Sequence, residues 1–204
     1  MRRYIALLRG VNISGKNKLA MSELKLCILK LGFSKVLTYL NSGNLVFSCD
    51  LESEAQIASK IGTMLQEQFG MDIPVLVISQ DRLKTVLSSA PDWWGTTDPA
   101  VYDNLIFVFP GVTAEQVAER IGAPTAGLEQ ISTVEREIFW SFDRQKYAKA
   151  NWWKKTASKG IGELLTIRTA NTLRKIAAMG EIKKGIHGKW KRVFLTAWMR
   201  FMDI

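Results

Sequence analysis

Apolar residues in the first ninety positions follow two different spacings. The compact apolar run at residues 3–9 is typical of a strand. Apolar residues three and four positions apart come next, at Leu24, Ile28 and Leu31, and predict a helix that ends at Gly32. Continued along the segment, these spacings predict the order β-α-β-β-α-β-α, with elements near residues 3–9, 24–31, 36–41, 45–49, 57–69, 73–78 and 83–87.

The same order of elements is expected a second time after residue 103. The stretch PDWWGTTDPAVYD, residues 91–103, is rich in turn-forming residues and predicts a linker. Beyond it, Thr113 and Gln116 have the spacing of a capping box at the start of a helix. The second set of elements is expected near residues 104–109, 113–122, 128–134, 137–142, 144–159, 164–168 and 171–179.

A β-α-β-β-α-β order is that of the ferredoxin-like unit, in which two helices cover one face of an antiparallel sheet. The chain is therefore predicted to be an α+β protein of two tandem ferredoxin-like (βαββαβ) halves with antiparallel sheets, at residues 1–90 and 104–180. The pattern is compatible both with sheets that pack face to face and with sheets that join edge to edge.

A basic amphipathic tail is expected at residues 181–204, beyond the two halves. Placed on a helix, KWKRVFLTAWMRFMDI gathers its aromatic residues on one face and arginines on the other. Such an extra C-terminal helix can dock on its own domain, form a homodimer, or lie on an anionic membrane surface. Docking or a homodimer through the tail is the favoured interpretation.

Composition is that of a soluble globular protein, with 47% hydrophobic and 23% charged residues. The two cysteines, Cys27 and Cys49, are too few for a disulfide framework or a zinc site, which favours a reducing compartment. The start of the chain is a poor signal peptide, and no apolar run is long enough for a transmembrane segment. A cytoplasmic location is expected.

The formal charge of +9 is concentrated in the last third, where residues 141–204 carry 15 basic and 4 acidic side chains. Such a region can recruit nucleic acid, or it can be a solvated lysine-rich surface. Lysine and tryptophan stand together in NWWKKTASKG and KWKRVF, although Trp152 and Trp153 are expected to be core or interface residues. The strand GNLVFS lacks the aromatic pattern of RNA-recognition modules.

Glycines, asparagines and cations are concentrated in the stretch LLRGVNISGKNKLAM, directly after the first strand. A glycine-rich turn between strand and helix can present backbone N–H groups to an anion. The spacing is not that of a P-loop. The alternative is that the glycines only permit the turn and the asparagines tie the loop together.

The turn YLNSGN supplies a second polar cluster. In a ferredoxin-like sheet the first strand lies beside the third, so this turn and the loop can be close, and one interpretation is that they form one site. Turn formation alone also explains Asn-Ser-Gly-Asn and is the favoured interpretation.

Catalytic groups are scarce in this sequence. The one histidine, His187, lies in the glycine-flanked tail segment GIHGK, and no nucleophile motif is present. The E-x-E pairs at residues 52–54 and 135–137 do not form a metal-site signature. No catalytic residue, metal or cofactor is predicted, and an enzyme of unrecognised type ranks third among the functions considered.

The segments YIALLRGVNISGKNKLAMSEL, LGF and VLTYLNSGNLVF, within residues 4–47, resemble the family catalogued as domain of unknown function 1697 (DUF1697). Its members open with a similar strand, an R-G-x-N-x-G-G-K-N loop, a helix and an S-G-N hairpin. Ser14 stands where the family has a second glycine, and Ala20 where it often has proline. The resemblance implies a fold and motif positions, and no reaction.

Family members tend to show the pattern T-x-R-N-W-x-T near the end. Here Thr166, Arg168, Asn171 and Thr172 are retained, and the middle pair is Thr169 and Ala170. The resemblance thus adds Arg168 to the candidate site. Our leading hypothesis is a small phosphate- or carboxylate-bearing ligand at the Arg9–Lys18 loop, and the alternative is a nucleic-acid-binding protein. The candidate residues are Arg9, Gly10, Asn12, Gly15, Lys16, Asn17, Lys18, Asn41, Ser42, Asn44 and Arg168.

Overall fold

A computed structural model describes residues 1–13, 15, 17–51 and 53–180 of the chain. The helix expected in the tail, together with Lys16 and His187, lies outside the described residues. Within the described part of the chain, no helix is long and apolar enough to cross a membrane.

The first half has the predicted ferredoxin-like topology. Its four strands form one antiparallel sheet in the order β2-β3-β1-β4. Ser53 accepts a hydrogen bond from the Gln56 backbone at the start of the longest helix, and Gly70 ends that helix in a left-handed conformation. The elements are β1 (Arg2–Leu8), α1 (Met21–Lys30), β2 (Ser34–Tyr39), β3 (Asn44–Cys49), α2 (Glu54–Phe69), β4 (Val75–Ser79) and α3 (Gln80–Ser88).

The second half repeats this plan, with the strand order β6-β7-β5-β8. The predicted capping box of Thr113 and Gln116 is present. The elements are β5 (Val101–Val108), α4 (Ala114–Ile121), β6 (Glu129–Val134), β7 (Glu137–Asp143), α5 (Asn151–Thr156), β8 (Leu165–Thr169) and α6 (Ala170–Ala178), with 3-10 turns at Tyr147–Lys149 and Gly162–Leu164.

One helix of the second half is shorter than predicted. The sequence pattern favoured a helical stretch over 144–159, whereas α5 covers only Asn151–Thr156. The Asp143 carboxylate accepts hydrogen bonds from the backbone N–H groups of Gln145 (2.8 Å) and Lys146 (3.1 Å). These bonds fold the chain into a turn directly after β7, so the helix begins later.

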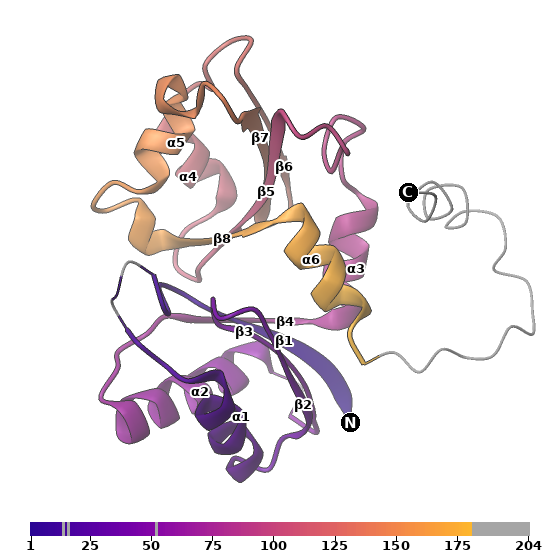
Figure 1. Ribbon diagram of the computed structural model, residues 1–204, viewed down its shortest axis with the longest axis vertical. Helices are drawn as coiled ribbons and strands as arrows, with labels where there is room; N and C mark the ends of the chain where they lie inside the picture. Colours follow the sequence, from indigo (N-terminus) through magenta and orange to yellow (C-terminus); the bar gives the residue numbers. More distant parts are fainter. Residues whose placement is uncertain (14, 16, 52, 181–204) are drawn as a thin grey trace, which may run out of the picture.

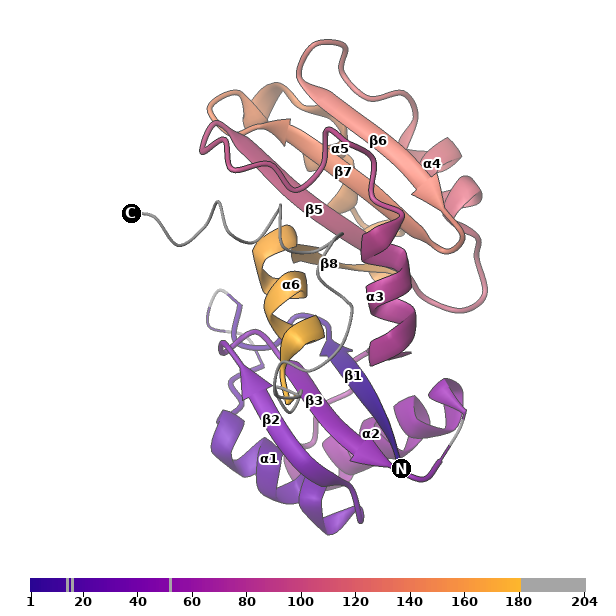
Figure 2. The same cartoon turned by 90° about the vertical axis from the view of Figure 1, so that its right-hand side faces the viewer.

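The two sheets face each other, with α3 and α6 side by side between them (Figures 1 and 2). Each sheet turns its other face toward its own pair of helices. Alternate strand residues, such as Ile5 and Leu7 of β1 and Leu105 and Phe107 of β5, line the central core. The face-to-face alternative is therefore the observed one, with a helical layer in between.

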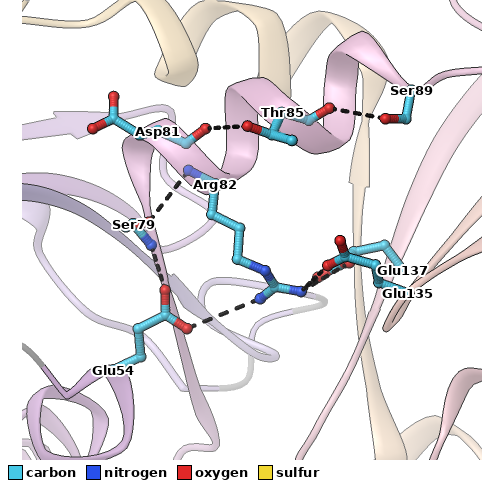
Figure 3. A network of polar contacts seen from close by, with 8 residues as sticks. All are labelled: Glu54, Ser79, Asp81, Arg82, Thr85, Ser89, Glu135 and Glu137. Carbon is cyan, nitrogen blue, oxygen red and sulfur yellow. Dashed lines mark hydrogen bonds and ion pairs between the residues drawn. The ribbon is translucent and has the colours of Figure 1, made fainter.

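Arg82 of α3 joins the two halves through carboxylates (Figure 3). Its Nη2 lies 2.9 and 3.1 Å from the two oxygens of Glu137 and 3.4 Å from Glu135, both in the β6–β7 hairpin. Its Nη1 lies 3.9 Å from Glu54, at the start of α2. The Glu137 side chain is only 4% exposed. Water and salt therefore weaken its attraction to Arg82 less than they weaken the attraction within a surface ion pair.

Glu137 should make stability depend on pH. Burial raises the pKa of Glu137, and the nearby Arg82 guanidinium opposes that rise. Because the folded state holds this proton more tightly than the unfolded state, the contribution of Glu137 becomes more favourable as pH falls from neutral through its raised pKa. We expect Glu137→Gln to lose this component of the pH dependence, measured by urea unfolding at successive pH values. The exposed Glu119→Gln serves as control, and identical pH profiles for all three proteins would contradict the prediction.

Candidate functional site

Asn12 is the central brace of the loop between β1 and α1. Its side-chain N–H groups donate to the carbonyls of Leu19 and Asn41, each at 2.8 Å, and its Oδ1 accepts from the Leu19 N–H at 2.8 Å. The residue adopts a left-handed conformation with φ 54°, which asparagine tolerates better than most residues. The Asn12 side chain therefore holds the loop to the β2–β3 turn and is occupied by protein atoms.

Asn17 closes the other side of the loop. Its side chain donates to the Gly10 carbonyl at 3.1 Å, and its own carbonyl accepts from the Asn12 N–H at 3.1 Å. Gly10 and Gly15 have φ values of 70° and 76°, in the region that favours glycine. These contacts give both asparagines and both glycines a role in the shape of the loop.

The β2–β3 turn lies against the end of β1, as the topology predicted. Leu7 is paired with Asn44, and the Leu8 N–H donates to the Gly43 carbonyl at 2.8 Å. A Cβ placed on Gly43 would lie 2.7 Å from the Leu8 Cβ, and Gly43 has a φ of 73°. Glycine is needed here both for the backbone conformation and for the close approach.

Gly43→Ala should lower the free energy of unfolding by about 2 kcal/mol or more, because the methyl group meets Leu8 in addition to the cost of a left-handed alanine. Gly15→Ala is the matched control. Gly15 has a similar φ but no atom within 4 Å of the position that a methyl group would take, so only the backbone cost of about 1 kcal/mol applies. Equal losses in urea unfolding would show that the contact with Leu8 is unimportant.

Arg168 of β8 crosses from the second half into the loop cluster of the first. Its Nε donates to Asn44 Oδ1 at 2.6 Å, and its Nη2 donates to the carbonyls of Leu8 at 2.7 Å and Ser42 at 3.2 Å. Its Nη1 donates to Thr166 Oγ1 at 2.9 Å and to the Ile167 carbonyl at 2.8 Å. Every hydrogen-bonding direction of this guanidinium is thus used by the protein.

No carboxylate takes part in the contacts of Arg168 among the described residues. Burial lowers the pKa of Arg168 to about 10, which leaves the group charged at neutral pH. A buried cation surrounded by neutral oxygens keeps a positive potential around it. The region where the β1–α1 loop and the β2–β3 turn meet β8 and the Gly162–Leu164 turn is called the seam below.

Asn44, the first residue of β3, also uses its side chain for contacts within the protein. Asn44 donates to the Tyr39 carbonyl at 3.0 Å and to Ser42 Oγ at 3.1 Å. Asn41, in contrast, is exposed and offers only its backbone carbonyl, to Asn12. The structure thus brings the candidate residues of loop, turn and β8 together, but directs most of their polar atoms inward.

Arg9 differs from Arg168 because its guanidinium donates no hydrogen bond to a described residue. It is half-buried at the end of β1, and its Nη2 lies 3.5 Å from the position that a Cβ of Gly162 would take. The guanidinium therefore reaches across the seam to the second half. Within the described residues, neither Arg9 nor the exposed Lys18 forms an ion pair or a side-chain hydrogen bond.

Residues 1–139 match the model of a family described as protein of unknown function (DUF1697). The chain belongs to the DUF1697 family. It is similar to a solved structure titled the structure of conserved bacterial protein SP0830 from Streptococcus pneumoniae, with 30% identity and a TM-score of 0.75. The similarity covers 86% of this chain and 97% of that one. No curated protein matches the chain.

Sequence reasoning missed Gly162 as a neighbour of the loop in this DUF1697 protein. Gly162 is more than 150 residues from Arg9 along the chain, and the isolated sequence GIGEL carries no signal for the contact. Two surface hollows lie on α2, one around Gly62 and Asp72 and one around Gln56 and Lys60, and neither includes a residue of the loop. No group of three or more metal-ligating side chains occurs among the residues that the structure describes.

Proposed function

We propose that this DUF1697 protein binds a small phosphate- or carboxylate-bearing ligand at the seam, with Arg9 as the principal contact. The observation that carries the proposal is the position of the Arg9 guanidinium, held between the two halves without an acidic partner among the described residues. A guanidinium presents paired N–H donors that match the oxygens of a phosphate or carboxylate.

The surroundings of Arg9 support binding of an anion. Its backbone N–H donates to the Pro74 carbonyl at 3.0 Å, which fixes the start of the loop, and Asn12 and Asn17 brace the rest. A braced loop loses little conformational freedom when a ligand binds. Arg168, whose Nη2 contacts the carbonyl directly before Arg9, adds a second positive charge that no described carboxylate offsets. An anion at the seam would lower the repulsion between the two arginines.

We also propose that the protein and its ligand are cytoplasmic. Cys27 and Cys49 are both unpaired, which agrees with a reducing compartment.

The lysines of the β1–α1 loop are further candidate contacts. Lys18 is exposed and can contact a ligand from the solvent side, and Lys16 belongs to the same segment of the chain.

Thermal unfolding with inorganic pyrophosphate tests the proposal. Ligand binding to the native state raises the melting temperature, and at a concentration 100-fold above Kd the stabilisation is about 2.7 kcal/mol. We expect the wild type to show this rise at constant ionic strength. Arg9→Met, which keeps the apolar stem and removes the charge, should abolish it.

The matched control is Lys25→Met, an equal change of charge on the exposed face of α1. It should respond to pyrophosphate as the wild type does. If pyrophosphate, phosphate and citrate all leave the wild-type melting temperature unchanged, the protein does not bind such anions. A rise that is equal in the wild type and Arg9→Met would place the anion elsewhere.

A further inference from the structure

Two aromatic side chains are exposed next to each other on the second half. Trp153 of α5 is 42% exposed and Tyr147 of the preceding 3-10 turn is 45% exposed. Their rings form an edge-to-face pair with centroids 5.0 Å apart. Trp152 is fully buried, as the sequence reasoning expected, but Trp153 presents much of its ring to solvent. The helix α5 lies beside α4 on the face of the second sheet that points away from α3 and α6 (Figure 1).

These exposed rings rest on a fixed support. Trp153 packs on Phe142 of β7, with ring centroids 5.4 Å apart, and Phe142 packs on Tyr102 of β5 at 5.3 Å. We call the four rings of Tyr102, Phe142, Tyr147 and Trp153 the aromatic platform. Trp152 anchors the helix beneath, because its Nε1 donates to the Gly122 carbonyl at 2.9 Å. The platform is therefore ordered before any partner arrives.

The segment that carries Tyr147 and Trp153 is strongly basic. Residues 144–162 contain six basic residues and no acidic residue. One of them is paired with a carboxylate, Lys146 with Asp143 at 3.2 Å. The Arg144 guanidinium lies over the Tyr102 ring at 5.3 Å. The others are exposed and form no ion pair among the described residues, namely Lys149, Lys154, Lys155 and Lys159.

We infer that the aromatic platform and its lysines bind single-stranded nucleic acid. Trp153 and Tyr147 supply faces and edges for unstacked bases, and the lysines neutralise the phosphates that connect them. A single strand is favoured over a duplex because the bases of a duplex are stacked on each other and cannot reach a flat ring. A second copy of this surface is an unsuitable partner, because it would bring the same six cations into contact with themselves.

The lack of an RNA-recognition pattern in β3 does not affect this inference, because the platform is built by β5, β7 and α5 of the other half. Binding would be tolerant of sequence, since every base has a ring face and no base-specific hydrogen bonding is invoked. The four rings of the platform are not among the residues proposed to bind the anion at the seam, so the two proposals are tested by different variants.

Fluorescence anisotropy of the full chain with a labelled single strand of about 15 nucleotides tests this inference. Trp153→Ala should weaken binding about tenfold or more, the usual loss for one stacked base, while Trp153→Phe should retain most of the affinity. Lys154→Gln with Lys155→Gln should weaken binding and reduce its dependence on salt between about 50 and 200 mM. Lys25→Gln with Lys30→Gln, an equal charge change on α1, and Arg9→Met should bind as the wild type does.

Three results would overturn the inference. The first is an absence of binding at about 50 mM salt. The second is equal affinity of the wild type and Trp153→Ala for the single strand, since attraction of phosphate alone does not require the ring. The third is tighter binding to a duplex of the same length or to anionic phosphatidylserine vesicles. Because Trp153 packs on Phe142 and Tyr147, the melting temperature of each variant is measured in parallel, and affinities are compared at a temperature at which every variant is folded.

Discussion

Arg168→Ala is expected to lower the free energy of unfolding by about 3 kcal/mol, measured by urea unfolding at neutral pH. The substitution removes the donor to three oxygens of the first half: the carbonyls of Leu8 and Ser42 and the Oδ1 of Asn44. A buried acceptor that loses its partner costs about 1 to 3 kcal/mol. The substitution also removes the free-energy cost of burying a cation, which offsets part of the destabilisation.

Two further variants separate charge from geometry at Arg168. Arg168→Lys keeps the charge, but a single ammonium cannot reproduce the fork that spans Asn44, Leu8 and Thr166, so most of the loss should remain. Arg120→Ala, at an exposed position of α4, should change stability by less than about 0.5 kcal/mol. If Arg168→Ala is as stable as Arg120→Ala, the guanidinium does not hold the seam together.

Glu129→Ala is expected to destabilise the second half by a similar amount, about 3 kcal/mol. The buried carboxylate accepts hydrogen bonds from the backbone N–H groups of Thr125 (2.9 Å), Asn151 (2.8 Å) and Trp152 (3.0 Å) and from Trp140 Nε1 (3.3 Å). Asn151 and Trp152 begin α5, where free N–H groups and the helix dipole favour a negative charge. When the carboxylate is removed, these N–H groups lose the acceptor that they share inside the protein.

Hydrogen exchange gives this prediction a local readout. The amides of Asn151 and Trp152 should exchange faster in Glu129→Ala, while those of the first half keep their protection. Glu129→Gln should lie between the wild type and Glu129→Ala, because it retains one acceptor oxygen but places an N–H group among donors. Unchanged protection at Asn151 and Trp152 in Glu129→Ala would show that the carboxylate does not anchor α5.

Local patterns were sufficient to predict most of the elements. The helix ends at Gly32 and Gly70 and the capping box at Thr113 and Gln116 depend on residues close in sequence, so the sequence shows them directly. The late start of α5 was not predicted because it depends on which backbone groups the Asp143 side chain bonds. That choice competes with helix formation and has no periodic signal.

The packing of the two halves was left open by the sequence, although one signal was present. The runs YIALL in β1 and LIFV in β5 are apolar at every position, so both faces of each strand must be covered. One face of each sheet is covered by a pair of helices, α1 and α2 on the first sheet and α4 and α5 on the second. The other face packs in the central core with α3 and α6. The sequence alone does not say which elements supply the second cover.

The candidate site was predicted in part. The strand order of the fold correctly placed the β2–β3 turn beside the loop, since Leu7 pairs with Asn44. The inward use of Asn12 and Asn44 and the neighbour Gly162 could not be predicted, because these contacts depend on side-chain directions and on the approach of the second half. Arg168 became a candidate through the family resemblance. The residues that its side chain contacts are either one or two positions away in sequence or at least 124 positions away.

An NMR titration of the wild type with pyrophosphate tests the seam proposal most directly. The account predicts saturable shifts of the backbone amides of Arg9, Gly10, Lys18 and Gly162, at constant ionic strength, and their loss in Arg9→Met. Shifts confined to the basic segment 144–159, or no saturable shift at the seam at any concentration, would contradict it.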